Sequence, residues 1–127
     1  RQLDRPNLSV VPVTATPLAW YGAADLFVCS SYEESFPRVI MEAMACSVPI
    51  LSTHVHGIRD MLESGRDAWL VPPGDSHALA TGLASALADR DLASTQAAQA
   101  RARVTAFDSR TLLPRHAALA ARIAAQA

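Results

Sequence analysis

The chain of 127 residues carries a formal net charge of −1, half of its residues are apolar, and fewer than a fifth are charged. This composition fits one globular domain with its own hydrophobic core and argues against a disordered chain. No stretch approaches the roughly 20 apolar residues that span a bilayer, and the sequence opens without the basic and apolar regions of a secretion signal.

The first part of the chain predicts two strands with a short helix between them. Residues 8–11 (Leu-Ser-Val-Val) are mostly apolar and lie between two prolines, which indicates a strand. Thr16 can cap a short helix that starts at Pro17 and runs to about residue 22. Residues 26–29 form a continuous apolar run, which is typical of a strand buried on both faces of a parallel sheet.

The middle of the chain continues the alternation of strands and helices. A loop over residues 30–36 leads to a helix from Pro37 to about Cys46, and further strands are predicted at 49–53 and 68–71, with a short helix at 58–62 between them. Four strands alternating with helices are typical of right-handed βαβ units. We therefore expect an α/β fold, a Rossmann-like parallel sheet with flanking helices.

Three helices are expected at the end of the chain. Ser76 can cap one that runs to about residue 88, Asp91 can cap one that runs to about residue 105, and the last covers about 110–126. Residues 1–95 hold six Arg and eleven Asp or Glu, whereas residues 96–127 hold five Arg and one Asp. The acidic first part argues against nucleic-acid binding. The basic end indicates a solvated helix face, with an acidic neighbouring domain or an anionic membrane surface as alternatives.

The two cysteines, Cys29 and Cys46, have neither the spacing of a zinc site nor that of a redox motif. We interpret both as reduced, buried packing residues. They indicate a cytoplasmic protein, with a peripheral location at the inner membrane as the alternative.

A carboxylate inside an apolar helix is the most informative feature of the sequence. Every residue from 39 to 45 is apolar except Glu42. A helix that is apolar all round is buried, and a buried carboxylate needs a hydrogen-bond donor. A ligand with paired hydroxyls, such as a ribose, would supply donors. An arginine in the core or in another domain is the alternative.

The loop before this helix predicts an anion site. It follows the carboxyl end of a parallel strand and leads into a helix N-terminus, where free backbone N–H groups favour phosphate. Glu34 lies in this loop, where it is either a ligand contact, a solvated carboxylate or a local cap. Glu33 is interpreted as a surface charge, Met41 and Met44 as core residues, and His56 and Arg38 as weaker ligand candidates. Trp20 and Tyr21 are interpreted as packing residues.

An ordered series of motifs extends this pattern. Seven residues separate Glu34 from Glu42, the helix continues Glu42-Ala43-Met44-Ala45, and Val48-Pro49-Ile50, His56-Gly57-Ile58 and 67–75 follow in order. Over about residues 8–105 the chain resembles the group 1 glycosyltransferases, a retaining family (family 4) with the glycosyltransferase-B fold. It differs from the usual family pattern at Ser35-Phe36-Pro37, Ser47, His56 and 67–68.

The resemblance implies roles for individual residues. Glu34 would face the donor sugar as the catalytic carboxylate, and Glu42 would hold the ribose hydroxyls of the nucleotide. The backbone N–H groups of the sugar and phosphate region would come from Ser35, Phe36, Arg38 and Val39. The family works without a bound metal ion or other cofactor, and the donor would be a UDP-, GDP- or ADP-sugar.

The resemblance also implies how much of an enzyme the chain contains. Residues 1–105 would be a partial nucleotide-sugar-binding domain and 106–127 its C-terminal helix, from a longer bacterial hexosyltransferase with a separate N-terminal acceptor-binding domain. We expect the isolated chain to bind donor rather than catalyse transfer. A homodimer through an exposed sheet edge is a further expectation. The alternatives are a non-catalytic nucleotide-binding module and a dimerising interaction module.

Overall fold

Three of the predicted strands form one parallel sheet in the computed structural model, which describes residues 5–125. They are β1 (Phe27–Cys29), β2 (Ile50–Thr53) and β3 (Trp69–Val71), in the order β1-β2-β3. β2 lies in the centre, and all four of its residues are buried. This arrangement confirms the predicted α/β fold with a parallel sheet.

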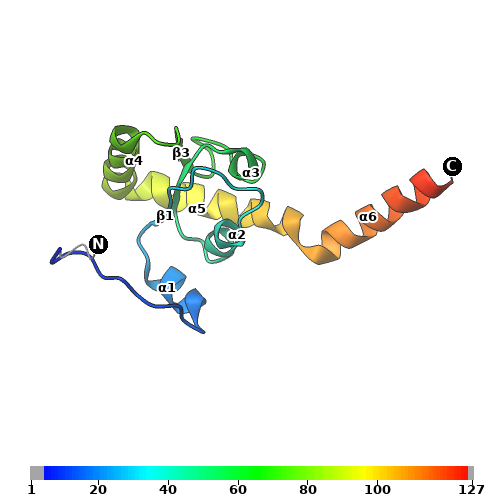
Figure 1. Cartoon of the computed structure of the whole chain (residues 1–127), viewed down its shortest axis with the longest axis horizontal. Helices are drawn as coiled ribbons and strands as arrows, with labels where there is room; N and C mark the ends of the chain where they lie inside the picture. Colours follow the sequence, from blue (N-terminus) through cyan, green and yellow to red (C-terminus); the bar gives the residue numbers. More distant parts are fainter. Residues whose placement is uncertain (1–4, 126–127) are drawn as a thin grey trace.

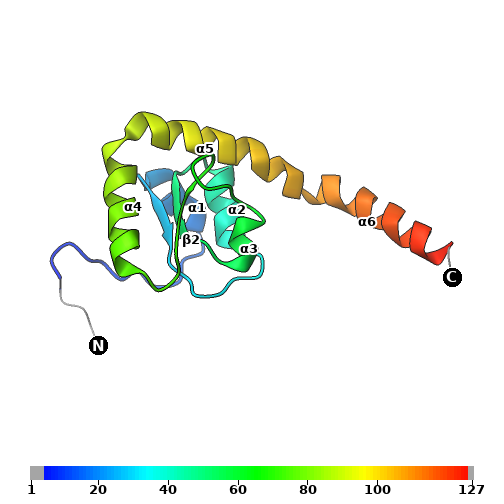
Figure 2. The same cartoon turned by 90° about the horizontal axis from the view of Figure 1, so that it is seen from above.

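Helices cover both faces of the sheet (Figure 1). Seen from above, α4 lies on one side of the sheet and α2 on the other, and α5 crosses one end of the layers (Figure 2). α5 packs on both α2 and α4, and α1 packs on α2. The helices are α1 (Pro17–Ala23), α2 (Arg38–Ala45), α3 (His56–Arg59), α4 (Ser76–Ala88), α5 (Arg90–Val104), the 3-10 turn η1 (Thr105–Phe107) and α6 (Ser109–Ala124).

The core forms between the sheet and α2, α3 and α5. The fully buried side chains include Ile40 and Met44 of α2, Ile50 of β2, and Ile58 and Met61 in and after α3. The core side chains therefore pack beside the edge of the sheet that carries the β1–α2 loop. This packing fixes the position of the start of α2.

The strand predicted at residues 8–11 is wrong. This segment forms no regular element, and Val10 is 84% exposed. A strand is stable only when a neighbour pairs with its backbone groups, and β1 pairs with β2 alone. The sheet consequently has three strands within residues 5–125 instead of the four that were predicted.

Several predicted helix starts are displaced by one or two residues. Asp75 and Asp89 cap α4 and α5 through their carboxylates, in place of Ser76 and Asp91. A carboxylate one or two residues earlier in the chain reaches the free N–H groups of the first turn. Pro37 is the N-cap of α2 and not its first residue, and α3 covers His56–Arg59 instead of 58–62. The side chain of Thr16 makes no capping bond to α1.

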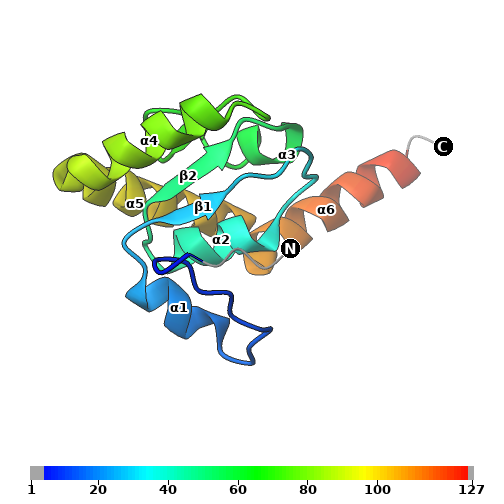
Figure 3. The same ribbon diagram turned by 60° about the vertical axis from the view of Figure 1, so that its left-hand side comes forward.

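The prediction that α2 is buried on all sides is also wrong. Ile40, Ala43 and Met44 are buried, but Val39 is 41% exposed and the Glu42 side chain is 30% exposed. The helix has one outer side, because α1 and α5 flank it without enclosing it (Figure 3). Other burial predictions are mixed: Cys29 is buried and Cys46 half-buried, and Tyr21 is buried while Trp20 is 54% exposed.

α6 extends away from the sheet and packs on η1 (Figures 1 and 2). None of its residues is buried, and Leu113, Leu119 and Ile123 are exposed. The predicted end of this helix at Gln126 lies outside the described residues. Within residues 5–125, the longest apolar helical stretch falls short of what a bilayer requires. The expected dimer through a sheet edge, and a partner for the basic end, stay predictions.

Candidate functional site

The loop between β1 and α2 is fixed to its neighbours at two points. The Thr53 hydroxyl at the end of β2 donates to the Ser31 carbonyl oxygen at 2.6 Å. The Gly57 N–H in α3 donates to the Glu34 carbonyl oxygen at 2.9 Å. Both contacts come from elements packed in the core, so the loop has a defined path over the carboxyl edge of the sheet.

Glu34 is half-buried in this loop, and its carboxylate has a local donor. The Ser31 hydroxyl donates to Glu34 Oε1 at 2.8 Å. Among the residues that the structure describes, Oε2 has no protein partner. The side chain is therefore oriented through one oxygen and can accept a hydrogen bond through the other.

The predicted backbone donors follow Glu34 directly. Ser35, Phe36, Arg38 and Val39 are all exposed, and in the described part of the chain none of their N–H groups has a protein acceptor. Pro37 has no N–H and leads into the first turn of α2. Four free amides at the start of a helix form a site that suits a phosphate group.

Glu42 lies one turn after Arg38, on the wall of a hollow of about 430 Å³. Its Oε2 accepts a hydrogen bond from the Tyr21 hydroxyl at 3.1 Å, and its Oε1 lies 3.8 Å from the Arg38 guanidinium. The Arg38 side chain is 85% exposed, so this ion pair is weak. The other residues of the hollow are Leu18, Met41, Ala45, Val104, Thr105, Phe107 and Asp108.

Tyr21 keeps its proton over a wide pH range. Burial, followed by the hydrogen bond to Glu42 and its charge, raises the pKa of Tyr21 from 10.0 to about 12. The neutral phenol therefore remains a donor to the carboxylate at physiological pH. This contact joins α1 to α2 and directs the Glu42 side chain, which sequence reasoning had assigned to a ligand or an arginine.

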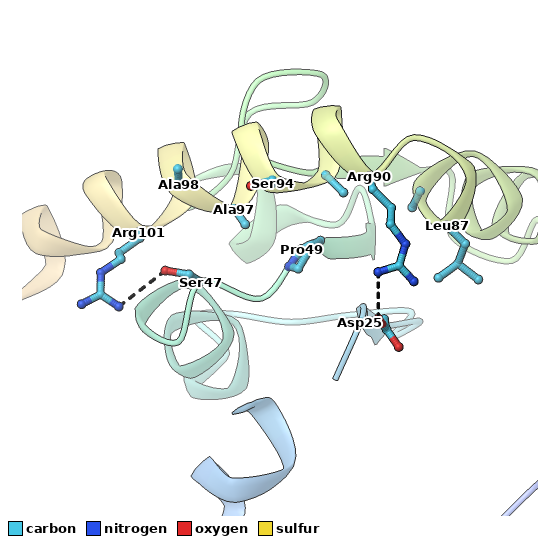
Figure 4. A pocket seen from close by; sticks show the side chains of 11 residues that line it. Asp25, Ser47, Pro49, Leu87, Arg90, Ser94, Ala97, Ala98 and Arg101 are labelled. Atoms are coloured by element: carbon cyan, nitrogen blue, oxygen red, sulfur yellow. Dashed lines mark hydrogen bonds and ion pairs between the residues drawn. The ribbon is translucent and has the colours of Figure 1, made fainter. Parts of the chain in front are cut away.

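A second hollow lies at the opposite edge of the sheet, where α5 passes the residues that precede β1 and β2 (Figure 4). It has a volume of about 420 Å³. The charges on its rim have protein partners: Arg90 lies 3.4 Å from Asp25, and Arg101 donates to the Ala45 carbonyl at 2.7 Å and to the Ser47 hydroxyl at 3.5 Å. This hollow is therefore distinct from the Glu34 loop, because it lies at the other edge of the sheet and the charges on its rim already have protein partners.

Several residues of the site were not found from the sequence. Tyr21 was interpreted as a packing residue, and Ser31 and Thr53 were not singled out. Gly57 was quoted only as part of a motif. A serine three residues before Glu34 is a weak signal for a local hydrogen bond, because short polar side chains commonly bond nearby groups in loops. Within residues 5–125, no group of three or more potential metal ligands lies together.

Comparisons with known proteins found similar sequences and similar structures. A family profile described as Glycosyl transferases group 1 matches residues 3–89. The D-inositol 3-phosphate glycosyltransferase 2 of Catenulispora acidiphila is 43% identical over 79 residues, which cover 61% of this chain and 18% of that protein. This chain therefore spans less than a fifth of that relative's length.

Solved structures show the same arrangement of elements. Sucrose-phosphate synthase from Thermosynechococcus elongatus superposes with a TM-score of 0.80 at 33% identity, covering 93% of this chain and 30% of that one. Anabaena Alr3699/HepE in complex with UDP-glucose superposes with a TM-score of 0.74 at 30% identity, covering 81% of this chain and 29% of that one.

Proposed function

The chain belongs to the group 1 glycosyl transferases, and from this membership we propose that it is the part of such an enzyme that binds the nucleotide-sugar donor. The similar HepE structure was solved with UDP-glucose, which supports a donor of this class. Because the chain spans 30% or less of the relatives described above, the reaction of the whole enzyme is part of the proposal.

The observation that carries the proposal is the position of Arg38 and Glu42 on one wall of the same hollow. Residues four apart on a helix lie on one face, about 6 Å apart. In a nucleotide the ribose and the phosphates are adjacent. A ribose whose hydroxyls donate to Glu42 therefore places its phosphates near Arg38 and the free amides at the start of α2.

The lining of the hollow suits a nucleoside. Leu18, Met41, Val104 and Phe107 offer apolar surface to a base, and Glu42 is the carboxylate among them. The Phe36 ring packs edge-on against Phe107, with ring centroids 5.4 Å apart, and so connects the amide-rich loop to the hollow. Glu42 is 30% exposed, which leaves room for an incoming hydroxyl beside the Tyr21 contact.

We assign the transferred sugar to Glu34. Its free Oε2 would accept a hydrogen bond from a sugar hydroxyl, while the free N–H groups of Ser35, Phe36, Arg38 and Val39 would face the diphosphate. In the transfer step the bond between the anomeric carbon and the diphosphate oxygen would break, a bond from an acceptor hydroxyl oxygen to that carbon would form, and the proton of that hydroxyl would pass to the departing diphosphate oxygen. The diphosphate leaves as an anion, and preorganised amides and Arg38 would stabilise its charge. Retention of the anomeric configuration and a hexosyl donor are parts of this proposal.

Isothermal titration of the chain with uridine, guanosine and adenosine diphosphates tests the proposal. We expect one of the three to bind, and Glu42→Gln to weaken that binding about tenfold or more, because a hydrogen bond to a charged group contributes about 1.5–3 kcal/mol. Glu33→Gln is the matched control, since it removes the same charge from an exposed side chain nearby. A folded chain that binds none of the three nucleotides would overturn the proposal and favour an interaction module.

A further inference from the structure

Three residues make hydrogen bonds that fix the loop around Glu34, and one of them, Ser31, bonds its carboxylate. Resting on the function proposed above, we propose that Ser31, Thr53 and Gly57 are positioning residues that aim Glu34 at a hydroxyl of the transferred sugar. None of them needs to touch the sugar. Each acts through a hydrogen bond or a backbone contact to the Glu34 loop.

Ser31 connects Glu34 to the centre of the sheet. Its hydroxyl donates to Glu34 Oε1 at 2.8 Å, and its carbonyl oxygen accepts from the Thr53 hydroxyl at 2.6 Å. Thr53 is 3% exposed and belongs to β2, which is paired on both sides. Two successive hydrogen bonds therefore link the carboxylate to β2, the central and fully buried strand of the sheet.

Gly57 holds the backbone of Glu34 by a separate hydrogen bond from α3. Its N–H donates to the Glu34 carbonyl oxygen at 2.9 Å. A Cβ atom at position 57 would lie 1.8 Å from the Ser35 carbonyl oxygen and 2.6 Å from that of Glu34. Real Cβ contacts of this kind are at least 3.0 Å, so any side chain here must displace the loop by more than about 1 Å. Glycine is required for this close approach of α3 to the loop.

The consequence is a carboxylate with one oxygen held and one oxygen available. Oε1 accepts from Ser31, and in the described part of the chain Oε2 has no protein partner. An ionised carboxylate only accepts hydrogen bonds. The group that Oε2 is poised to meet is therefore a donor, and a hydroxyl of a neutral sugar fits this description. The Ser31 and Thr53 hydroxyls would thus affect recognition of the sugar and leave recognition of the nucleotide intact.

The experiment uses isothermal titration with UDP-, GDP- and ADP-glucose and with UDP, GDP and ADP. For each base, it measures the difference in affinity between the diphosphate glucose and the diphosphate alone. We expect Ser31→Ala and Thr53→Val to reduce this difference about threefold to tenfold, as the loss of an orienting hydrogen bond would, and to leave binding of the diphosphate unchanged. Thr53→Ser keeps the hydroxyl and should keep the difference. Ser30→Ala, at an exposed serine next to Ser31, is the matched control.

Gly57→Ala gives a second, stronger test. It displaces the loop that carries both Glu34 and the Ser35 amide, so we expect it to weaken binding of the diphosphate as well as the sugar. Circular dichroism and the thermal midpoint of each variant establish that it is folded.

The outcomes separate this inference from the proposed function. If Glu34→Gln removes the gain from the sugar while Ser31→Ala and Thr53→Val do not, the positioning role is wrong and donor binding stands. If wild type binds a diphosphate but gains nothing from the glucose, the assignment of the sugar to Glu34 and the positioning role both fail. If wild type binds no nucleotide, donor binding fails and the positioning role fails with it.

Discussion

Replacing Tyr21 with phenylalanine tests the contact that directs Glu42. The Tyr21 hydroxyl donates to Glu42 Oε2 at 3.1 Å and lies 3.3 Å from the Val39 carbonyl oxygen, so it links α1 to two residues of α2. Tyr21→Phe removes this hydroxyl and keeps the ring, which packs 5.5 Å from the Phe27 ring. The change therefore removes both contacts of the hydroxyl with α2 and keeps the packing of the ring.

The expected loss of stability is moderate. A hydrogen bond to a charged group contributes about 1.5–3 kcal/mol when both partners are buried. Glu42 is 30% exposed and Arg38 lies 3.8 Å away, so water and the guanidinium replace part of the interaction in the variant. We therefore expect the free energy of unfolding to fall by about 1 kcal/mol, which lowers the thermal midpoint of a domain of this size by roughly 3–5 °C.

A double-mutant cycle with Glu42→Ala, which removes both carboxylate oxygens, measures the contact itself. Urea unfolding of wild type, both single variants and the double variant yields four free energies of unfolding. We expect the double variant to lose about 1 kcal/mol less than the sum of the single losses, because the same bond is removed only once. Strictly additive losses would refute the hydrogen bond between Tyr21 and Glu42.

The pH dependence provides an independent check with a defined sign. The pKa of Tyr21 is raised from 10.0 to about 12 in the folded chain, so the unfolded chain releases this proton first as the pH rises. The contribution of the phenol is complete below pH 10 and is lost between pH 10 and about 12. Wild type should lose more stability than Tyr21→Phe over that interval. Parallel stability curves for the two proteins would contradict the raised pKa.

Two further predictions concern polar groups in the core. Gln96 is 1% exposed, and its Oε1 has no partner among the described residues. Gln96→Leu should therefore raise the free energy of unfolding by about 1–2 kcal/mol. Gln99→Leu is the control, since Gln99 is exposed and its side-chain oxygen accepts a hydrogen bond from Arg66. Urea unfolding that shows Gln96→Leu to be destabilised would contradict this. Asp67 is 1% exposed, accepts from the Glu63 N–H and lies 3.3 Å from Arg103. Asp67→Ala should lower the free energy of unfolding by about 2–3 kcal/mol. This loss is smaller than that for breaking a fully buried ion pair, because Arg103 is 31% exposed. An unchanged midpoint of urea unfolding would refute the role of this pair.

The sequence was most informative where local pattern and packing agree. The apolar run at 26–29 and the segment at 49–53 predicted β1 and β2 to within one residue. The prediction that the first of these strands is buried on both faces is wrong, because Val28 in the middle of β1 is 42% exposed. The free amides of Ser35, Phe36, Arg38 and Val39 follow from a loop that enters a helix after a parallel strand. The strand predicted at 8–11 failed because local apolar character cannot supply the neighbouring strand that pairs with it.

From residue 17 onward, the sequence by itself determined the order of strands and helices, the parallel sheet and the place of Glu34 and Glu42 relative to the start of α2. These features depend on residue spacing and on hydrogen bonds between neighbours along the chain. Only the tertiary structure decided that α2 keeps one exposed side, that Tyr21 meets Glu42 from 21 residues away, and that Gly57 touches the Ser35 backbone. Such contacts depend on how separate elements pack, which no local pattern of residues specifies.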